Sequence, residues 1–377
     1  MFITQSQGFK SFVPVSLDPP PELKRDGELR QLVESAALAI GQLDSFTPQV
    51  PDPDLFVAMY VRREAVLSSQ IEGTQSTLDD VLSYELDPDV PGLPSDVGQI
   101  VNYVRAMNSG LERLSTLPLS LRLLKEIHAE LMANGRGAAK THGEFRRSQN
   151  WIGPEGRPIG EAVFVPPSVP DMNRALIDFE LFLHADHGLE TLVKVGIAHA
   201  QFETIHPFLD GNGRVGRLLI TFLLVTNGML HRPLLYLSYY LKSNRLEYYD
   251  RLMAIRTNGD WEGWLKFFLK GVELTAKEAA NTAQAIIKLR QKLHNGVREV
   301  NGGQKQLDLL DLLFETPITN VQFVNRHLNV SLPTANSLVN KFEQLGILTE
   351  ITGFRRNRKF RFEPYLQLFT EKMTPIG

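Results

Sequence analysis

The residues best suited to chemistry lie together at positions 205–217, in the order Ile-His-Pro-Phe-Leu-Asp-Gly-Asn-Gly-Arg-Val-Gly-Arg. His206 is the only side chain of this stretch that titrates near neutrality, so it can serve as a base. Asp210 offers the hard oxygen ligands that Mg²⁺ prefers, and Mg²⁺ in turn takes phosphate oxygens as co-ligands. Arg214 and Arg217 are three residues apart, so on a helix they share a face and suit phosphate oxygens. Together these residues indicate transfer of a phosphate-containing group.

Two helical patterns flank this stretch and must position it. Before it, one face of a helix is predicted from the spacing of Leu192, Val195, Gly196, His199, Ala200 and Phe202. After it, the same spacing is kept by Leu218, Leu219, Phe222, Leu223 and Leu224. The stretch is therefore predicted to be a tight loop that ends one helix and begins another. The free N–H groups and positive dipole of a helix N-terminus favour an anion there, and Gly211 and Gly213 allow a sharp turn and close approach to a ligand.

Two ordinary explanations compete with this hypothesis. A glycine-rich turn often only reverses the chain, and a single histidine is often a core residue. A P-loop is excluded because no Gly-Lys-Ser/Thr follows a strand pattern. Eight specified positions in one string nevertheless favour function. The string resembles the Fic-family signature, His-x-Phe-x-Asp/Glu-Gly-Asn-Gly-Arg-x-x-Arg, with every position filled, and the resemblance extends from about Asp54 to Lys270.

The resemblance implies a mainly α protein, with a Fic-type helical core and a β-hairpin flap. It implies a protein adenylyltransferase that moves AMP from ATP to a Tyr, Thr or Ser hydroxyl of a protein, itself included. His206 would be the catalytic base, and Asp210 would hold Mg²⁺. The ATP-binding residues implied by the signature are Asp210, Gly211, Asn212, Gly213, Arg214 and Arg217.

A second motif ends a helix predicted from Leu55 to about Glu72. Taken alone, Glu72 is a surface glutamate that opposes the helix dipole. Beside the signature, the segment resembles the inhibitory Ser/Thr-x-x-x-Glu-Gly/Asn motif of Fic proteins. The resemblance implies that Glu72 pairs with Arg217 and obstructs the site of the γ-phosphate of ATP. Ser68, four residues earlier, lies on the same helix face, and the motif's position before the core matches the class with an N-terminal inhibitory helix.

Residues 151–165 predict a β-hairpin with a turn that contains glycine and proline. A buried hairpin without a special role is the alternative. The resemblance makes it the flap over the active site, where an exposed edge would hold an extended segment of the target protein. Ile152, Gly153 and Phe164 are the flap candidates.

Paired tyrosines follow the signature at Tyr248 and Tyr249. Such aromatic residues are more often part of a core than of a ligand site. The resemblance places them beside the adenine. Where the family often has an asparagine seven residues further on, this chain has Arg256, so that base contact is not carried over.

The 377-residue chain is long enough for two or three domains. Residues 1–95 are expected to form an N-terminal arm and helices that include the inhibitory motif, and residues 96–300 the catalytic core. Residues 304–377 predict helix-helix-helix-hairpin, which resembles a winged helix. Its groove-facing residues would be Thr334, Asn336, Ser337, Asn340 and Lys341, and its wing would carry Arg355, Arg356, Arg358 and Lys359. Winged helices bind either DNA or proteins, so this partner is left open.

Composition is that of an ordinary soluble protein, with 43% hydrophobic and 22% charged residues. The net charge of −3 gives no overall nucleic-acid footprint, and the absence of cysteine excludes disulfides and thiolate metal sites. No signal peptide or membrane span is apparent, so a cytoplasmic protein is expected, with a homodimer left open. Two other functions are kept: a nucleotide-sensing DNA-binding regulator, and a Fic-fold transferase that uses another phosphate donor.

Overall fold

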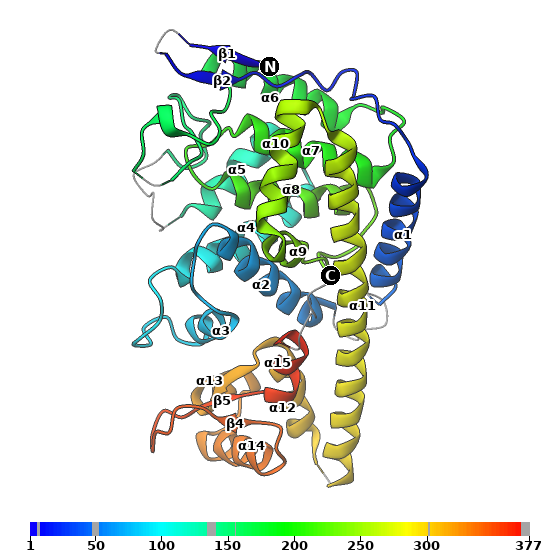
Figure 1. Ribbon diagram of the computed structural model, residues 1–377. Coiled ribbons are helices and arrows are strands. Elements are labelled where there is room, and N and C mark those ends of the chain that lie inside the picture. The colour runs from blue at the N-terminus through cyan, green and yellow to red at the C-terminus, as the bar shows by residue number, and fades with distance from the viewer. Residues whose placement is uncertain (6–7, 47–52, 134–140, 155, 301, 371–377) are drawn as a thin grey trace.

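The computed structural model describes residues 1–5, 8–46, 53–133, 141–154, 156–300 and 302–370. The chain is mainly helical, as predicted (Figure 1). Its helices are α1 (Gly27–Asp44), α2 (Pro53–Ile71), α3 (Leu78–Leu86), α4 (Val97–Leu114), α5 (Leu121–Leu131), the 3-10 turn η2 (Ile159–Glu161), α6 (Val169–His184), α7 (Thr191–Ile205), α8 (Asn212–Thr226), α9 (Ser238–Ser243), α10 (Arg245–Asn258), α11 (Trp261–Glu299), α12 (Gln304–Glu315), α13 (Val321–Leu328), α14 (Leu332–Gln344) and α15 (Glu363–Thr370).

The strands are short and form two small antiparallel sheets. In the first, β1 (Phe2–Thr4) pairs with β2 (Lys10–Phe12). In the second, β3 (Ile318–Asn320), β5 (Lys359–Arg361) and β4 (Thr349–Glu350) lie in that order. Within the described ranges, none of the helices combines the length and the apolar character that crossing a membrane requires.

Side-chain caps explain where several of the helices begin. The Asp26 carboxylate accepts a hydrogen bond from the N–H of Leu29 at the start of α1. Thr77 and Asp80 form a reciprocal capping box at the start of α3, and Ser120 caps α5. Each cap gives a partner to N–H groups that the first helical turn leaves free, which is worth about 1 kcal/mol.

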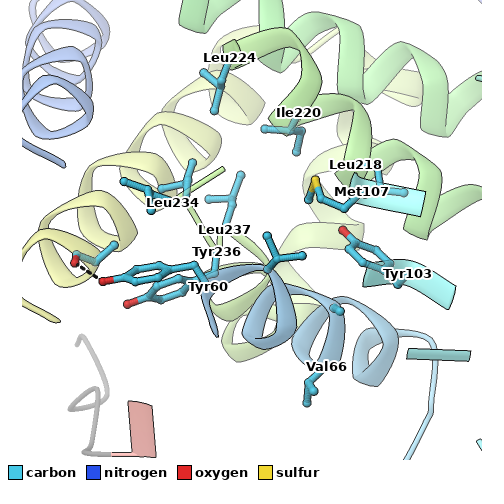
Figure 2. Packing of buried hydrophobic residues seen from close by; sticks show 14 of the residues in the cluster. Tyr60, Val66, Tyr103, Met107, Leu218, Ile220, Leu224, Leu234, Tyr236 and Leu237 are labelled. Atoms are coloured by element: carbon cyan, nitrogen blue, oxygen red, sulfur yellow. Dashed lines mark hydrogen bonds between the residues drawn. The ribbon is translucent and has the colours of Figure 1, made fainter. Parts of the chain in front are cut away.

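The two helices that flank the signature loop are the most buried of the fold. Every residue of α7 from Val195 to Ile205 is buried, and the loop begins at His206. Around them pack α2, α4, α6 and α11. Figure 2 shows part of this core, where Tyr60 and Tyr236 of neighbouring segments face one another. Helices buried on all sides can hold a loop between them rigidly.

The C-terminal unit, residues 304–370, has the predicted three helices and hairpin, with two additions. A third strand, β3, and a final helix, α15, were not predicted. Phe369 of α15 is buried and its ring lies 5.7 Å from that of Tyr60 on α2. The Tyr60 hydroxyl donates to the Ala279 carbonyl of α11 (2.9 Å), which Figure 2 also shows. The unit therefore shares apolar contacts with α2 and α11, the long helix that runs along it in Figure 1. The division at 95 and 300 stays a prediction.

Replacing Phe369 by alanine is expected to destabilise the whole protein, because the ring is buried between α15 and α2. Removal of a buried phenylalanine typically costs ~3–5 kcal/mol. Thermal unfolding should show a single transition at lower temperature. The control is Phe354→Ala, since the Phe354 side chain is exposed and surface substitutions usually change stability by less than about 0.5 kcal/mol. Unchanged unfolding of the Phe369 variant would mean that α15 does not stabilise α2.

The predicted β-hairpin at 151–165 is reduced to a single antiparallel bridge between Ile152 and Phe164. The Ile152 N–H donates to the Phe164 carbonyl, and the Val163 N–H donates to the Ile152 carbonyl (both 2.8 Å). Prolines at 154 and 158 cannot donate ladder hydrogen bonds, and η2 occupies the chain between them and Phe164. In the described residues, the segment has this one bridge instead of a regular hairpin.

Candidate functional site

His206 ends α7 in the left-handed backbone conformation, with φ of 49°. Few residues other than glycine adopt this conformation, so surrounding contacts must maintain it. The His206 N–H closes the helix on the Phe202 carbonyl (2.9 Å). The His206 carbonyl accepts from Arg146 Nε (3.1 Å) and Asn150 Nδ2 (3.3 Å). The backbone of His206 is therefore held both by the end of α7 and by the segment that carries Arg146 and Asn150.

Asn212 closes the signature loop on itself. Its side-chain oxygen accepts from the Phe208 N–H, and its amide nitrogen donates to the Phe208 carbonyl (both 2.8 Å). Asn150 Nδ2 also donates to the Phe208 carbonyl at 2.8 Å. Asn212 was expected to contact the phosphates, whereas here its polar atoms hold the loop.

His128 supports the loop from beneath. Its ring stacks on that of Phe208, with centroids 3.8 Å apart and planes 6° apart. The Gly143 N–H donates to His128 Nδ1 (2.9 Å), so Nε2 carries the proton and donates to the Asp210 carbonyl (3.1 Å). Burial lowers the pKa of His128 to about 4, and the ring is neutral at pH 7. These contacts make His128 a structural residue that holds the loop.

Helix α8 begins directly after Gly211, whose φ of 76° suits glycine. Arg214 follows in the first turn and is buried. Its polar neighbours at 3.5 Å are Gln99 Oε1 and the Met132 sulfur, and its buried Nε has no hydrogen-bond partner in the described part of the chain. A buried guanidinium with an unused donor at a helix N-terminus is suited to an anionic ligand.

Arg217, one turn further on, is held by α2. Its Nη2 lies 2.6 Å from Glu72 Oε1. The same guanidinium donates through Nε to the Ser68 hydroxyl (2.7 Å) and through Nη2 to the Ser68 carbonyl (3.0 Å). The predicted pairing of Glu72 with Arg217 is thus present, with Ser68 on the same helix face.

Glu72 is charged in this arrangement. Its side chain is 37% exposed while that of Arg217 is 2% exposed, so the carboxylate reaches inward onto a buried cation. Burial acts to raise the pKa of Glu72, but attraction by Arg217 and the hydrogen bond between them outweigh it and leave the pKa below its usual range. Gly213 makes room for this contact, because a Cβ there would collide with the Glu72 carboxylate.

Two further buried glutamates lie close to Arg217, and the sequence did not single them out. Glu64 accepts from the Ser238 backbone N–H (3.1 Å) and from its hydroxyl. Glu203 lies on α7 with Oε1 unpartnered in the described residues. Burial raises the pKa of each to about 7, although Arg217 attracts both. The cation therefore lies within reach of three carboxyl groups, of which Glu72 forms the direct ion pair.

The environment keeps His206 neutral. Burial lowers its pKa to about 4, and the positive charges of Arg256 and Arg146 act in the same direction, while Glu72 opposes them. An uncharged imidazole at pH 7 can accept a proton, as a general base must.

Asp210 is partly buried at the end of the loop, and its Oδ1 accepts from the Gly211 N–H (2.7 Å). Among the residues that the structure describes, no group of three or more His, Asp or Glu side chains could hold a metal ion. One carboxylate is what a Mg²⁺ ion needs from a protein when phosphates supply the other ligands.

The flap and tyrosine candidates occupy different environments. Phe164 points into the core, whereas Gly153 is exposed and Ile152 is half-buried. Tyr248 is buried, and its hydroxyl forms a hydrogen bond with His199 Nε2 (2.8 Å), so it cannot line an open nucleotide site in this conformation. Tyr249 is 38% exposed, 5.1 Å from the Tyr248 ring, and remains the candidate for a base contact.

Comparison with known proteins gives two matches to family models. The model of the Fic/DOC family N-terminal region matches residues 30–112, and that of the Fic/DOC family matches residues 118–224. Together they account for half of the chain.

The curated relatives include "Protein adenylyltransferase Fic" of Culex quinquefasciatus, 31% identical over 159 residues, which are 42% of this chain and 28% of that protein. The protein of the same name from Drosophila virilis is 30% identical over 161 residues, 42% of this chain and 30% of its own length. This chain therefore spans less than a third of these relatives.

Solved structures show the same fold at lower identity. A Fic family protein from Desulfovibrio desulfuricans has a TM-score of 0.59 at 20% identity, covering 91% of this chain and 98% of that one. A Fic domain containing signaling protein from Bacteroides thetaiotaomicron has a TM-score of 0.52 at 18% identity, covering 68% of this chain and 97% of that one.

The fold and the loop between α7 and α8 define a helical protein in which α8 begins at the loop and carries Arg214 and Arg217 in its first turns. The chain belongs to the Fic/DOC family, with the family's N-terminal region ahead of its Fic domain.

Proposed function

We propose that this protein is an adenylyltransferase that moves AMP from ATP to a hydroxyl side chain of a protein, and that Glu72 holds it in an inhibited state. The observation that carries the proposal is the 2.6 Å ion pair between Glu72 and Arg217, beside an Arg214 that has no carboxylate within ion-pair distance in the described residues. One cation is blocked by the chain itself, and the other is available to a phosphate.

In this mechanism His206 accepts the proton of the attacking Tyr, Thr or Ser hydroxyl. The hydroxyl oxygen forms a bond to the α-phosphorus, the bond to the β-phosphate oxygen breaks, and pyrophosphate leaves. His206 can act in this way because its lowered pKa keeps it neutral. Its left-handed backbone and the hydrogen bonds to its carbonyl hold the main chain from which the imidazole projects.

The phosphates would be held by the start of α8. The N–H groups near Gly213 and the guanidinium of Arg214 would bind α- and β-phosphate oxygens. Asp210 is the residue that would hold Mg²⁺, and the ion would neutralise phosphate charge there. Arg217 would bind the γ-phosphate once Glu72 leaves it.

The experiment is incubation of the Glu72→Gly variant with ATP labelled with ³²P at either the α or the γ position. Adenylylation labels protein from the α position only. Label from the γ position alone would indicate a phosphotransferase, and label from neither would reject both with this nucleotide. The same assay with other labelled nucleotides tests the alternative in which another phosphate donor is used.

Arg217→Ala, introduced into the Glu72→Gly background, is expected to weaken ATP binding by roughly tenfold or more. A hydrogen bond to a charged group typically contributes ~1.5–3 kcal/mol, and the γ-phosphate would lose its only proposed guanidinium. Calorimetry with ATP and with ADP measures this, and ADP affinity should change less. Arg251→Ala is the control, because Arg251 pairs with Glu247 on the surface of α10. Equal ATP affinities would remove Arg217 from the nucleotide site.

A second candidate function rests on a groove between the C-terminal unit and residues 83–91. Its volume is about 980 Å³, and its lining includes Asp87, Asn336 of α14 and the basic turn Arg355–Lys359. The exposed polar face of α14 and this turn favour an anionic partner such as duplex DNA. Fluorescence anisotropy with labelled DNA at two salt concentrations tests it, since phosphate contacts make affinity fall steeply with salt.

A further inference from the structure

Arg256 of α10 is buried close to the signature loop. In the sequence it stood out only as a departure from the family pattern. The residue is 8% exposed, and its guanidinium carbon lies 3.8 Å from the centroid of the Phe164 ring. Burial lowers its pKa to about 10, so it remains a cation at neutral pH. A guanidinium over a buried aromatic ring is a favourable contact whose strength increases when water is excluded.

The same guanidinium donates two hydrogen bonds to the last turn of α7. Its Nε lies 3.2 Å from the Thr204 hydroxyl, and its Nη2 lies 3.2 Å from the Glu203 carbonyl. That carbonyl belongs to the end of the helix, where backbone oxygens lack helical partners and a cation is favoured. His206 follows two residues after Thr204. Arg256 thus supports the helix end from which the imidazole projects.

Phe164 connects the other side of Arg256 to the flap segment, residues 151–165. Its backbone forms the bridge with Ile152. Its ring lies 6.0 Å from that of Phe12, and the next residue, Val165, accepts a hydrogen bond from the Phe12 N–H (2.9 Å). The flap segment is therefore fastened at Phe164 between the N-terminal strand β2 and Arg256.

The charge of Arg256 also acts on His206. Besides burial, four groups influence the imidazole: the cations Arg256 of α10 and Arg146 of the loop before the flap, which lower its pKa, and the Glu72 carboxylate and the Glu203 backbone, which raise it. Arg146 itself is committed to the carbonyls of His206, Ser148 and Pro167. Removing the Arg256 charge should therefore raise the pKa of His206 from about 4 toward 6.5.

We propose that Arg256 is a positioning residue for the transfer reaction, which fastens the flap segment at Phe164 to the end of α7 and so fixes the flap relative to His206. This inference rests on the proposed function for its catalytic consequence, while the fastening itself can be measured without any activity.

Three variants separate the roles of Arg256. Arg256→Met keeps a long apolar side chain but removes the charge and the hydrogen bonds. Arg256→Lys keeps the charge but loses the planar guanidinium and its fixed set of hydrogen-bond donors. Arg251→Met removes a positive charge from the exposed face of the same helix and is the matched control.

The first two measurements use the chain with Glu72 intact and need no activity. In Arg256→Met, amide hydrogen exchange of residues 151–165 should become faster while α7 and α8 stay protected, and NMR titration should show a higher pKa for His206. In Arg256→Lys, exchange of the flap should become faster while the pKa of His206 stays near that of the parent. Arg251→Met should change neither.

The third measurement is AMP transfer in the Glu72→Gly background. We expect Arg256→Met to lower turnover by ~10- to 10²-fold, the scale of a misplaced reacting group, with ATP affinity unchanged. Its acid limb in a pH–rate profile should move to higher pH, and that of Arg256→Lys should not.

Unchanged flap exchange and unchanged His206 titration in Arg256→Met would overturn the proposal. So would faster exchange spread evenly over the chain, because that would indicate only a contribution to folding. If the Glu72→Gly parent itself transfers no AMP, the proposed function fails, whereas the exchange and titration results still decide whether Arg256 fastens the flap.

Discussion

Replacing His206 by alanine in the Glu72→Gly background is expected to abolish most AMP transfer while leaving nucleotide binding intact. General-base catalysis typically contributes ~10²–10⁴-fold, and this loss should appear in turnover. ATP affinity should stay within about twofold, because the proposed phosphate ligands lie at the start of α8, and His206 acts on the acceptor hydroxyl. The measurements are α-³²P incorporation over time and ATP binding by calorimetry.

The control for this prediction is His231→Ala. His231 lies outside the signature, is exposed and pairs with Asp44 of α1. It should transfer AMP at the rate of the Glu72→Gly parent. If the His206 variant also retained that rate, another group would have to be the base.

The pH dependence of AMP transfer by the Glu72→Gly parent follows from the direction of the pKa shift of His206. Its pKa is lowered, so the neutral, active form predominates above about pH 4 and is lost only as the pH falls through that value. Transfer should therefore show no loss from His206 protonation between pH 6 and 8. A midpoint near 6.5 in that profile would mean that the imidazole is solvated during turnover.

The second large effect is expected for Glu72→Gly, which should raise self-adenylylation strongly. The Glu72 carboxylate neutralises Arg217, and in the proposed site it would take the position of a γ-phosphate oxygen. ATP can bind beside it only with its phosphates displaced from the in-line geometry that attack requires. Removal of the side chain frees Arg217, so the gain should appear in turnover more than in nucleotide affinity.

The matched variants for this prediction change the charge of residue 72 and the base His206 separately. Glu72→Gln keeps the size but not the charge, and should give an intermediate rate. Glu85→Gly removes a glutamate that pairs with Arg62 instead of Arg217, and should stay inhibited. The gain must vanish in the Glu72→Gly, His206→Ala double variant. Equal rates for parent and Glu72→Gly would return Glu72 to the role of a surface residue that ends a helix.

Protonation of Glu72 should not relieve inhibition near neutral pH. The pKa of Glu72 is lowered in the folded protein, so the ion pair is fully present above the ordinary carboxyl value of 4.5 and is lost only as the pH falls below it. Release at physiological pH must then come from movement of α2 and not from protonation of Glu72.

The sequence determined the local parts of the site. The signature loop lies between two helices, as its spacing and glycines required, because the caps and turns that form it involve residues within a few positions of one another. The Phe208–Asn212 hydrogen bonds are of this kind. The pairing of Glu72 with Arg217 spans 145 residues, and it was predicted only because a resemblance connected the two motifs.

Only the tertiary structure decided which other residues surround the loop. Arg146 and Asn150 hold the His206 carbonyl, and Glu64 and Glu203 lie near Arg217, without any local pattern that marks them. Tyr248 was expected beside a nucleotide but is buried against His199, because α10 turns that side of its surface toward α7. Burial and partner choice depend on how helices pack, and a helix's own sequence fixes its apolar face but not its neighbour.

The flap and Arg256 show most clearly which features the sequence determined and which only the tertiary structure decided. Alternating apolar residues and turn signals predicted two strands, but prolines and the packing of Phe164 against Arg256 left one bridge. The sequence identified Arg256 only as an unexpected residue. Its contacts with Glu203, Thr204 and Phe164 come from segments about 50 and 90 residues away, and such contacts form only when the folded core brings helix ends and loops together.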